Sequence, residues 1–168
     1  MNRSELSAPA PLNVSHEVAA FDCGEAALNR WLAQQALKNE AGGASRTYVV
    51  CASDRVVGYY CLAAGAVVRD TAPKPMQRNM PDPIPVMVLG RLAVDRDYQH
   101  RGIGRALLRD AILRVLGVAE SVGVKAMLVH ALSDKAKGFY VAHGFRESPV
   151  EPMTLCLVLD SARQALSE

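Results

Sequence analysis

The feature that most limits the fold of this chain is a glycine-containing turn that joins an apolar strand to a long amphipathic helix. The strand is predicted over residues 86–94 and the helix over 104–121, and the turn between them ends in Gln-His-Arg-Gly-Ile-Gly at 99–104. Glycines let a backbone approach a ligand closely, and a helix N-terminus offers unpaired N–H groups and a favourable dipole. The turn therefore favours a phosphate-bearing ligand, although its spacing alone fits an ordinary strand-to-helix turn equally well.

Other phosphate and metal motifs do not match. A Walker loop requires Lys-Ser/Thr after its glycines, and a dinucleotide-binding loop requires a third glycine where this chain has Leu107. No His-Glu-x-x-His segment and no Cys/His spacing typical of zinc sites occurs in the sequence. We therefore expect no metal ion.

Strands and helices alternate through the second half of the chain, which predicts an α/β domain built on one sheet. All 168 residues are expected to form a single domain. The expected elements are a strand and turn at 12–21, a helix at 25–40, a hairpin of strands at 46–52 and 56–68, a Pro-rich surface loop at 71–85, a strand at 86–94, a helix at 104–121, a strand at 125–132, a helix from 133 to about 143, and a strand at 153–159.

Composition and charge narrow the class of protein. The residues from Met1 to Glu5 lack the apolar run of a signal peptide, and the longest apolar stretch, Cys61–Val68, is too short to span a bilayer. We expect a cytoplasmic protein that does not enter membranes, with its cysteines reduced and packed as small apolar residues. Net charge is only +2, with a positive excess in residues 51–110, which suits phosphate-bearing partners without establishing any. The four cysteines are Cys23, Cys51, Cys61 and Cys156.

Two motifs together resemble the GNAT superfamily of N-acetyltransferases. Gln99-x-x-Gly102-x-Gly104 is similar to the family's Q/R-x-x-G-x-G/A loop, and the segment Ser133–Phe145 is similar to its N-x-x-A-x-x-F-Y-x-x-x-G-F segment, with Ser133 in place of the usual Asn. The resemblance implies the GNAT fold, an α/β (mixed α+β) structure whose central, mostly antiparallel twisted sheet carries helices on both faces, and acetyl-CoA as co-substrate. The residues it implies in acetyl-CoA binding are Leu92, Ala93, Val94, Gln99, His100, Arg101, Gly102, Ile103, Gly104, Arg105, Ser133, Ala136 and Phe139.

The same resemblance implies that the backbone of Leu92–Val94 forms hydrogen bonds with the pantetheine arm of CoA, as it would with a neighbouring strand. Gly90 in this strand indicates either a bulge or a position where close packing excludes a side chain.

Tyr140 occupies the position of the family's general acid. A tyrosine hydroxyl has an ordinary pKa of about 10, so it carries its proton at neutral pH. A leaving thiol resembles cysteine, with a pKa of about 8.5, so complete proton transfer from tyrosine is uphill by about 2 kcal/mol. We expect Tyr140 to act through a partial transfer or a strong hydrogen bond to the sulfur.

The sequence does not identify a general base. His100, His130 and His143 are candidates by residue type, but each is more typical of a structural histidine. An α-amine has a pKa near 8 and is partly neutral at pH 7, whereas a lysine amine is not. The missing base therefore favours an α-amine acceptor.

The N-terminal third resembles one branch of the family. The segments Phe21–Gly24, Leu28–Leu32, Gly43–Val50 and Leu89–Val94 are similar to the TacT-like toxins of bacterial toxin–antitoxin modules. This resemblance implies acetylation of the α-amine on charged tRNA, a ribbon–helix–helix antitoxin, and a homodimer. Basic residues that could follow RNA phosphates are Arg30, Lys38, Arg46, Lys74, Arg78 and Arg91.

Three alternatives stay open at this point. The acceptor could be a protein N-terminus or a small-molecule amine. The chain could also be a GNAT-fold module that binds CoA or a partner without turnover.

Overall fold

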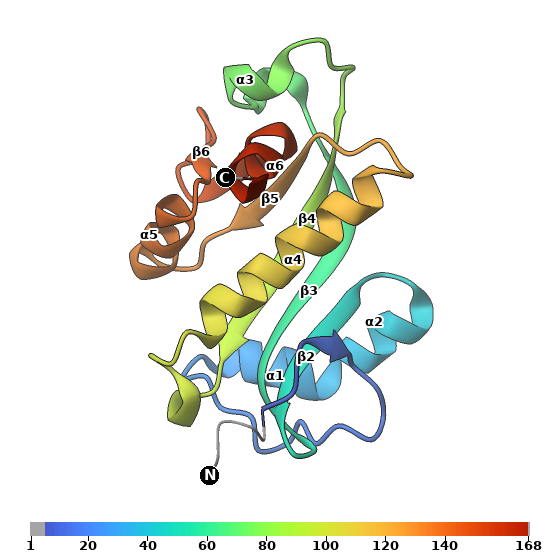
Figure 1. Cartoon of the computed structure of the whole chain (residues 1–168), viewed down its shortest axis with the longest axis vertical. Helices are drawn as coiled ribbons and strands as arrows, with labels where there is room; N and C mark the ends of the chain where they lie inside the picture. Colours follow the sequence, from blue (N-terminus) through green and yellow to red (C-terminus); the bar gives the residue numbers. More distant parts are fainter. Residues whose placement is uncertain (1–5, 168) are drawn as a thin grey trace. The chain divides into compact units, whose positions relative to one another are not determined.

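A computed structural model describes residues 6–167 of the chain, so the segment Met1–Glu5 lies outside the described residues. Within the described part, hydrogen-bonded strands follow the order β1 (Ala10–Pro11), β2 (Arg46–Ala52), β3 (Arg55–Val67), β4 (Ile84–Val94), β5 (Ala126–His130), β7 (Thr154–Val158) and β6 (Arg146–Glu147). The chain forms two compact units (Figure 1). Of the described residues, those up to Ala63 and Gly90–Ala111 form the N-terminal unit, and Ala64–Leu89 and those from Ile112 onward form the C-terminal unit.

A β-hairpin forms the centre of the N-terminal unit. Strands β2 (Arg46–Ala52) and β3 (Arg55–Val67) pair antiparallel, and β1 (Ala10–Pro11) pairs antiparallel with β2. The turn between β2 and β3 places Ser53 in the left-handed region, at φ 54°. This confirms the predicted hairpin.

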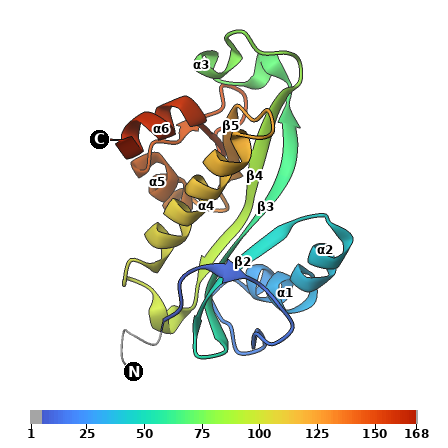
Figure 2. The same cartoon turned by 45° about the vertical axis from the view of Figure 1, so that its right-hand side comes forward.

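Successive residues of β3 face opposite sides, and a helix covers each side of the N-terminal unit. Tyr59 lies against Phe21 and stacks on Trp31 of helix α1 (Ala26–Gln34), with ring centroids 5.4 and 6.0 Å away. Gly58 faces the other way, where a Cβ would lie 3.1 Å from side-chain carbons of Ile103 and Leu107. Both belong to helix α4 (Ile103–Ala119) (Figure 2). The alternation of β3 therefore places helices on both faces, as the fold prediction requires.

In the C-terminal unit, β4 (Ile84–Val94) pairs parallel with β5 (Ala126–His130). Strand β7 (Thr154–Val158) pairs antiparallel with both β5 and β6 (Arg146–Glu147). The parallel pair of β4 with β5 and the antiparallel ladders elsewhere confirm a mixed, mostly antiparallel sheet. Besides the second half of α4, this unit carries the helices α3 (Lys74–Gln77), α5 (Asp134–Ala142) and α6 (Leu159–Ser167).

Several predicted boundaries were wrong. The strand expected at 12–21 is β1 at Ala10–Pro11, and the helix expected at 25–40 is divided at Gln35 into α1 and α2 (Ala36–Gly42). The loop expected at 71–85 contains α3, because Met76 is fully buried and anchors that turn in a cluster with Ala72 and Ile84. Helix α6 was not predicted at all. No helix among residues 6–167 is long and apolar enough to cross a membrane.

Candidate active site

The end of β4 leads directly into the predicted phosphate loop. Leu92 and Val94 are half-buried and Ala93 is buried in this strand. Gly90, which precedes them, permits a close approach to β3, because a Cβ there would lie 2.9 Å from the Sγ of Cys61. The packing explanation for Gly90 is thereby supported. Burial raises the pKa of the Cys61 thiol, so this cysteine stays protonated and apolar.

The loop alternates between ordinary and left-handed backbone conformations. After the 3-10 turn Arg96–Tyr98, Gln99 is extended, His100 has φ 63° and Gly102 has φ 82°, and α4 begins at Ile103. Backbone turns of this kind aim successive N–H groups at one point and form anion-binding nests. A Cβ built on Gly102 meets nothing within 4 Å, so the glycine is required by its dihedral angle and the space beside it is open.

The side chains around this nest provide positive charge. Arg101 and Arg105 are exposed, and the guanidinium of Arg101 lies 5.0 Å from the centroid of the Tyr98 ring. Ile103 instead points inward, against Gly58, and Gly104 is half-buried. An open nest, a helix N-terminus and exposed guanidinium groups form a site that fits a pyrophosphate.

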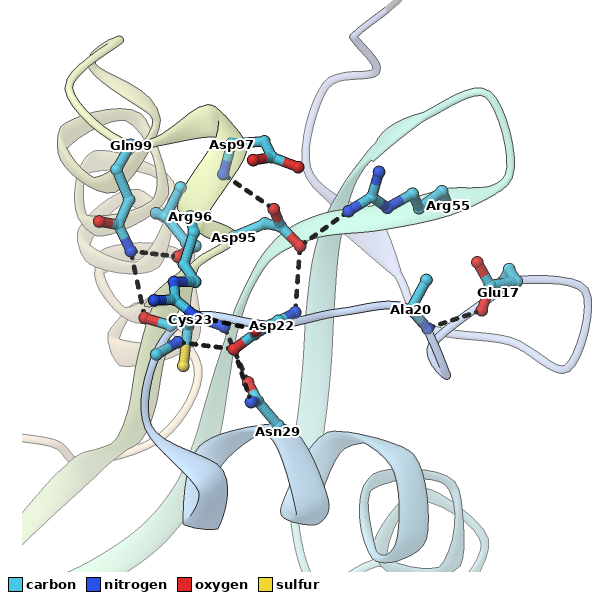
Figure 3. Close-up of polar contacts among 12 residues, drawn as sticks. Glu17, Ala20, Asp22, Cys23, Asn29, Arg55, Asp95, Arg96, Asp97 and Gln99 are labelled. Atoms are coloured by element: carbon cyan, nitrogen blue, oxygen red, sulfur yellow. Dashed lines mark hydrogen bonds and ion pairs between the residues drawn. The ribbon is translucent and has the colours of Figure 1, made fainter.

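Gln99 points into the protein. Its Nε2 donates to the carbonyl oxygens of Val94, at 2.9 Å, and Cys23, at 3.2 Å (Figure 3). The side chain of this motif residue thus fixes the start of the loop through two hydrogen bonds to the protein backbone.

The second motif lies in the C-terminal unit, on α5. Ser133 caps this helix, as predicted, because its Oγ accepts the N–H of Ala136 at 3.1 Å. Tyr140 is 5% exposed, with the rings of Phe139 and Phe145 at 5.3 and 5.4 Å. Gly144, at φ 96°, turns the chain so that Phe145 donates its N–H to the carbonyl of Tyr140. The G-F part of the motif therefore fixes the helix end that carries Tyr140.

The candidate bases have structural partners or lie on the surface. Nδ1 of His143 is 2.8 Å from the carbonyl oxygen of Phe139, and Nδ1 of His130 is 2.9 Å from Oγ1 of Thr154. His100 is exposed and supplies a left-handed loop residue. None of these contacts marks a histidine as the base. Among residues 6–167, no group of acidic, His and Cys side chains could hold a metal ion.

The six basic residues expected to contact RNA do not share one environment. Lys74 and Arg78 are exposed at α3, and Arg30 and Lys38 are exposed on α1 and α2. Arg46 pairs with Glu40 at 3.1 Å, and Arg91 lies with its guanidinium 4.3 Å from the centroid of the Trp31 ring. The cation–π stack holds the Arg91 side chain against α1, in a different setting from the exposed members of the set.

The sequence prediction overlooked Asp95, the buried carboxylate that follows β4. The sequence pattern that could have identified it is an acidic residue placed directly between an apolar strand and a turn. At such a position the Asp side chain often accepts hydrogen bonds from backbone N–H groups. Asp95 does accept the N–H of Asp97 at 3.0 Å.

Comparison with known proteins identifies the family. Residues 43–147 match the model of the acetyltransferase (GNAT) domain. The chain belongs to the GNAT acetyltransferases. It is 47% identical over 98% of its length to a Mycobacterium tuberculosis protein named tRNA-acetylating toxin, of which it covers 99%. It is 26% identical to a probable toxin TacT of Sinorhizobium fredii, with 90% of each chain covered.

Solved structures of GNAT toxins share this fold. A tyrosine-to-phenylalanine mutant of KacT superposes with a TM-score of 0.90 at 31% identity, covering 96% of this chain and 99% of that one. AtaT complexed with acetyl-methionyl-tRNA superposes with a TM-score of 0.89 at 30% identity and the same coverage. An AtaT mutant bound to the C-terminus of the antitoxin AtaR and to acetyl-CoA reaches 0.84 at 27% identity, covering 98% and 99% of the two chains. These matches confirm the predicted GNAT fold and its toxin branch.

Proposed function

We propose that this GNAT acetyltransferase is the toxin of a type II toxin–antitoxin pair, and that it acetylates the α-amine of the amino acid on charged tRNA. The observation that carries the proposal is 47% identity, over 98% of the chain, to a relative named for tRNA acetylation. The complex of AtaT with acetyl-methionyl-tRNA, a product of this kind, supports the same acceptor. An acetylated α-amine cannot attack the next peptidyl ester, so translation stops.

The residues of the chain suit this reaction. The pyrophosphate of acetyl-CoA would be held by the nest at His100–Gly102 and by the exposed Arg101 and Arg105. When bound, acetyl-CoA would supply the acetyl group as a thioester. The amine nitrogen attacks the carbonyl carbon, the carbon–sulfur bond breaks, and the amine releases one proton. The phenol of Tyr140 donates a hydrogen bond or proton to the departing sulfur. An α-amine needs little help to lose its proton, which agrees with histidines that have structural contacts.

The proposal extends to partners and organisation. The AtaT–AtaR complex supports neutralisation by an antitoxin, for which we propose a ribbon–helix–helix protein, and we propose a homodimer that acts in the cytoplasm, where charged tRNA is found. We also propose that the two units act as one acetyltransferase domain. Strands β3 and β4 and helix α4 each contribute residues to both units, and the chain covers nearly the whole length of the solved GNAT toxins.

Mass spectrometry of aminoacyl-tRNA incubated with the protein and acetyl-CoA tests the proposal. We expect one acetyl group on the aminoacyl adenosine, and none when acetyl-CoA is omitted. If aminoacyl-tRNA stayed unmodified while the same preparation acetylated peptide N-termini, the acceptor would be a protein N-terminus and the proposal would be wrong. Expression of the protein alone should arrest growth, and co-expression of the adjacent gene should relieve the arrest.

A further inference from the structure

The buried carboxylate of Asp95 connects the start of the phosphate loop, by hydrogen bonds, to a turn at Asp22–Gly24 that is distant in sequence. It is 1% exposed and lies between β4 and the 3-10 turn that opens the loop. Its Oδ2 accepts the N–H of Asp22 and the Nη2 of Arg55, each at 3.0 Å, and its Oδ1 accepts the N–H of Asp97 (Figure 3). A buried charge is tolerated when donors surround it, so these contacts fix Asp95 and the backbone of Asp22 together.

Gln99 forms a second hydrogen-bonded connection to the same turn. Its amide nitrogen donates to Cys23, the neighbour of Asp22, and to Val94 at the end of β4. The N–H of Arg96 also donates to the carbonyl of Asp22 at 2.9 Å. Hydrogen bonds therefore join the segment Asp22–Gly24 to both ends of the stretch from Asp95 to Gln99.

The same segment fixes the start of α1. Oδ1 of Asp22 accepts the N–H of Gly24 at 2.9 Å and Nδ2 of Asn29 at 3.0 Å, and Oδ1 of Asn29 accepts the N–H of Cys23 at 2.8 Å. The hydrogen bonds that the Asp22 carboxyl itself accepts hold its pKa below the usual range, with the Gly24 N–H the largest cause. Asn29 thus connects α1 to the turn, and the turn connects to the loop.

The nest itself needs such support. A non-glycine residue in the left-handed region is strained by about 1 kcal/mol or more and persists when its surroundings determine it. His100 is such a residue and follows Gln99 directly. The two hydrogen bonds of Gln99 thus hold the chain immediately before the strained position.

We propose that Gln99 and Asp95 are positioning residues that preorganise the phosphate loop for acetyl-CoA by anchoring it to the Asp22–Gly24 turn, and that this turn couples the loop to helix α1. The inference rests on the proposed use of acetyl-CoA and adds to it a role for side chains that do not face the ligand. Ligand binding is then favoured because less loop ordering is required at the moment of binding.

Calorimetric titration of the full chain with CoA tests this proposal. Gln99→Met keeps the side-chain length and removes both donors, and we expect it to raise Kd at least tenfold. Asn29→Ala, outside the loop, should raise Kd at least threefold. Glu17→Gln is the matched control, because Glu17 also accepts a backbone N–H, that of Ala20 at 3.0 Å, in the same unit (Figure 3). It should change Kd less than twofold.

Kinetics and unfolding separate positioning from general loss of structure. In Gln99→Met we expect the KM for acetyl-CoA to rise at least tenfold while kcat changes less than threefold. A lower unfolding midpoint with unchanged CoA affinity of the folded protein would overturn the proposal, and wild-type affinity in Asn29→Ala would overturn the coupling to α1. Failure of the wild-type chain to bind CoA would instead remove the proposed function itself.

Discussion

At the scale of single residues, the proposed acetyl transfer depends on Tyr140. Its ring is enclosed by Phe139 and Phe145, and its helix end is held by the Phe145 N–H. Removing the hydroxyl leaves these ring contacts in place, so the residue can be tested with little change in packing.

We expect Tyr140→Phe to lower kcat by about 10²- to 10⁴-fold, the usual contribution of a general acid. The Kd for CoA should stay within twofold, because the phosphate loop is unchanged. Continuous thiol-release assays measure kcat, and calorimetry measures Kd. Near-wild-type kcat would show that the departing sulfur takes its proton from another group.

The buried thiol of Cys156 makes the stability of the protein sensitive to alkaline pH. Burial raises the pKa of Cys156 from 9.0 to about 11, and the side chain is 3% exposed in the core of the C-terminal unit. Below pH 9 both folded and unfolded chains keep the thiol protonated, so its contribution to stability is fully present. As pH rises from 9 to 11 the unfolded chain ionises first, and the contribution is lost.

We expect the free energy of unfolding to fall by about 2 kcal/mol from this thiol by about pH 11. Urea unfolding at several pH values measures the effect. Cys156→Ala should have a lower free energy of unfolding at neutral pH but a flatter decline between pH 9 and 11. If the free energy of unfolding declined equally with pH in the two proteins, the raised pKa of Cys156 would be contradicted.

At the scale of elements, the turn from β4 into α4 is shaped by backbone dihedral angles. Gly102 has φ 82° and Gly43, which caps α2, has φ 76°, and an added Cβ at either meets nothing within 4 Å. The two glycines are thus matched in conformation and space, but one lies in the phosphate loop and the other at a helix end.

We expect Gly102→Ala and Gly43→Ala to lower the free energy of unfolding by similar amounts, about 1 kcal/mol, through strain at positive φ. Only Gly102→Ala should weaken CoA binding, by tenfold or more, because the strained residue belongs to the nest. Denaturant unfolding and calorimetry on both variants measure the two effects. Equal CoA affinity in the pair would show that the nest does not hold the phosphates.

At the scale of the whole molecule, a net charge of only +2 does not account for the proposed binding of tRNA. Local groups of basic residues have to supply the attraction. Lys74 begins α3 and Arg78 directly follows it, and both are exposed, whereas Arg46 and Arg91 already have partners, Glu40 and the ring of Trp31.

We expect Lys74→Gln with Arg78→Gln to weaken tRNA binding. The slope of log affinity against log salt should fall by about one for each phosphate that these side chains neutralise in the wild-type complex. Filter binding or anisotropy across a salt series measures both quantities. Acetyl-CoA binding, which we propose depends on the phosphate loop, serves as the control and should not change. An unaltered slope would place the RNA-binding residues elsewhere.

Some of this molecule could be predicted from short stretches of sequence. The β2–β3 hairpin, the helix after Gly102, the Ser133 cap and the family motifs were predicted correctly, because each depends on interactions within a few residues or on a spacing that recurs in the family. The break at Gln35 was missed, and so was helix α3, whose buried Met76 is stabilised by tertiary packing against Ala72 and Ile84.

The sequence by itself determined the loop, its glycines and the tyrosine at the family's spacing, since local dihedral preferences and motif order suffice for these. Only the tertiary structure decided where the side chains of the loop point. Gln99 bonds Cys23, 76 residues away, and Asp95 bonds Asp22 and Arg55, 73 and 40 residues away. No local pattern records such interactions, because they exist only after the sheet has brought these segments together.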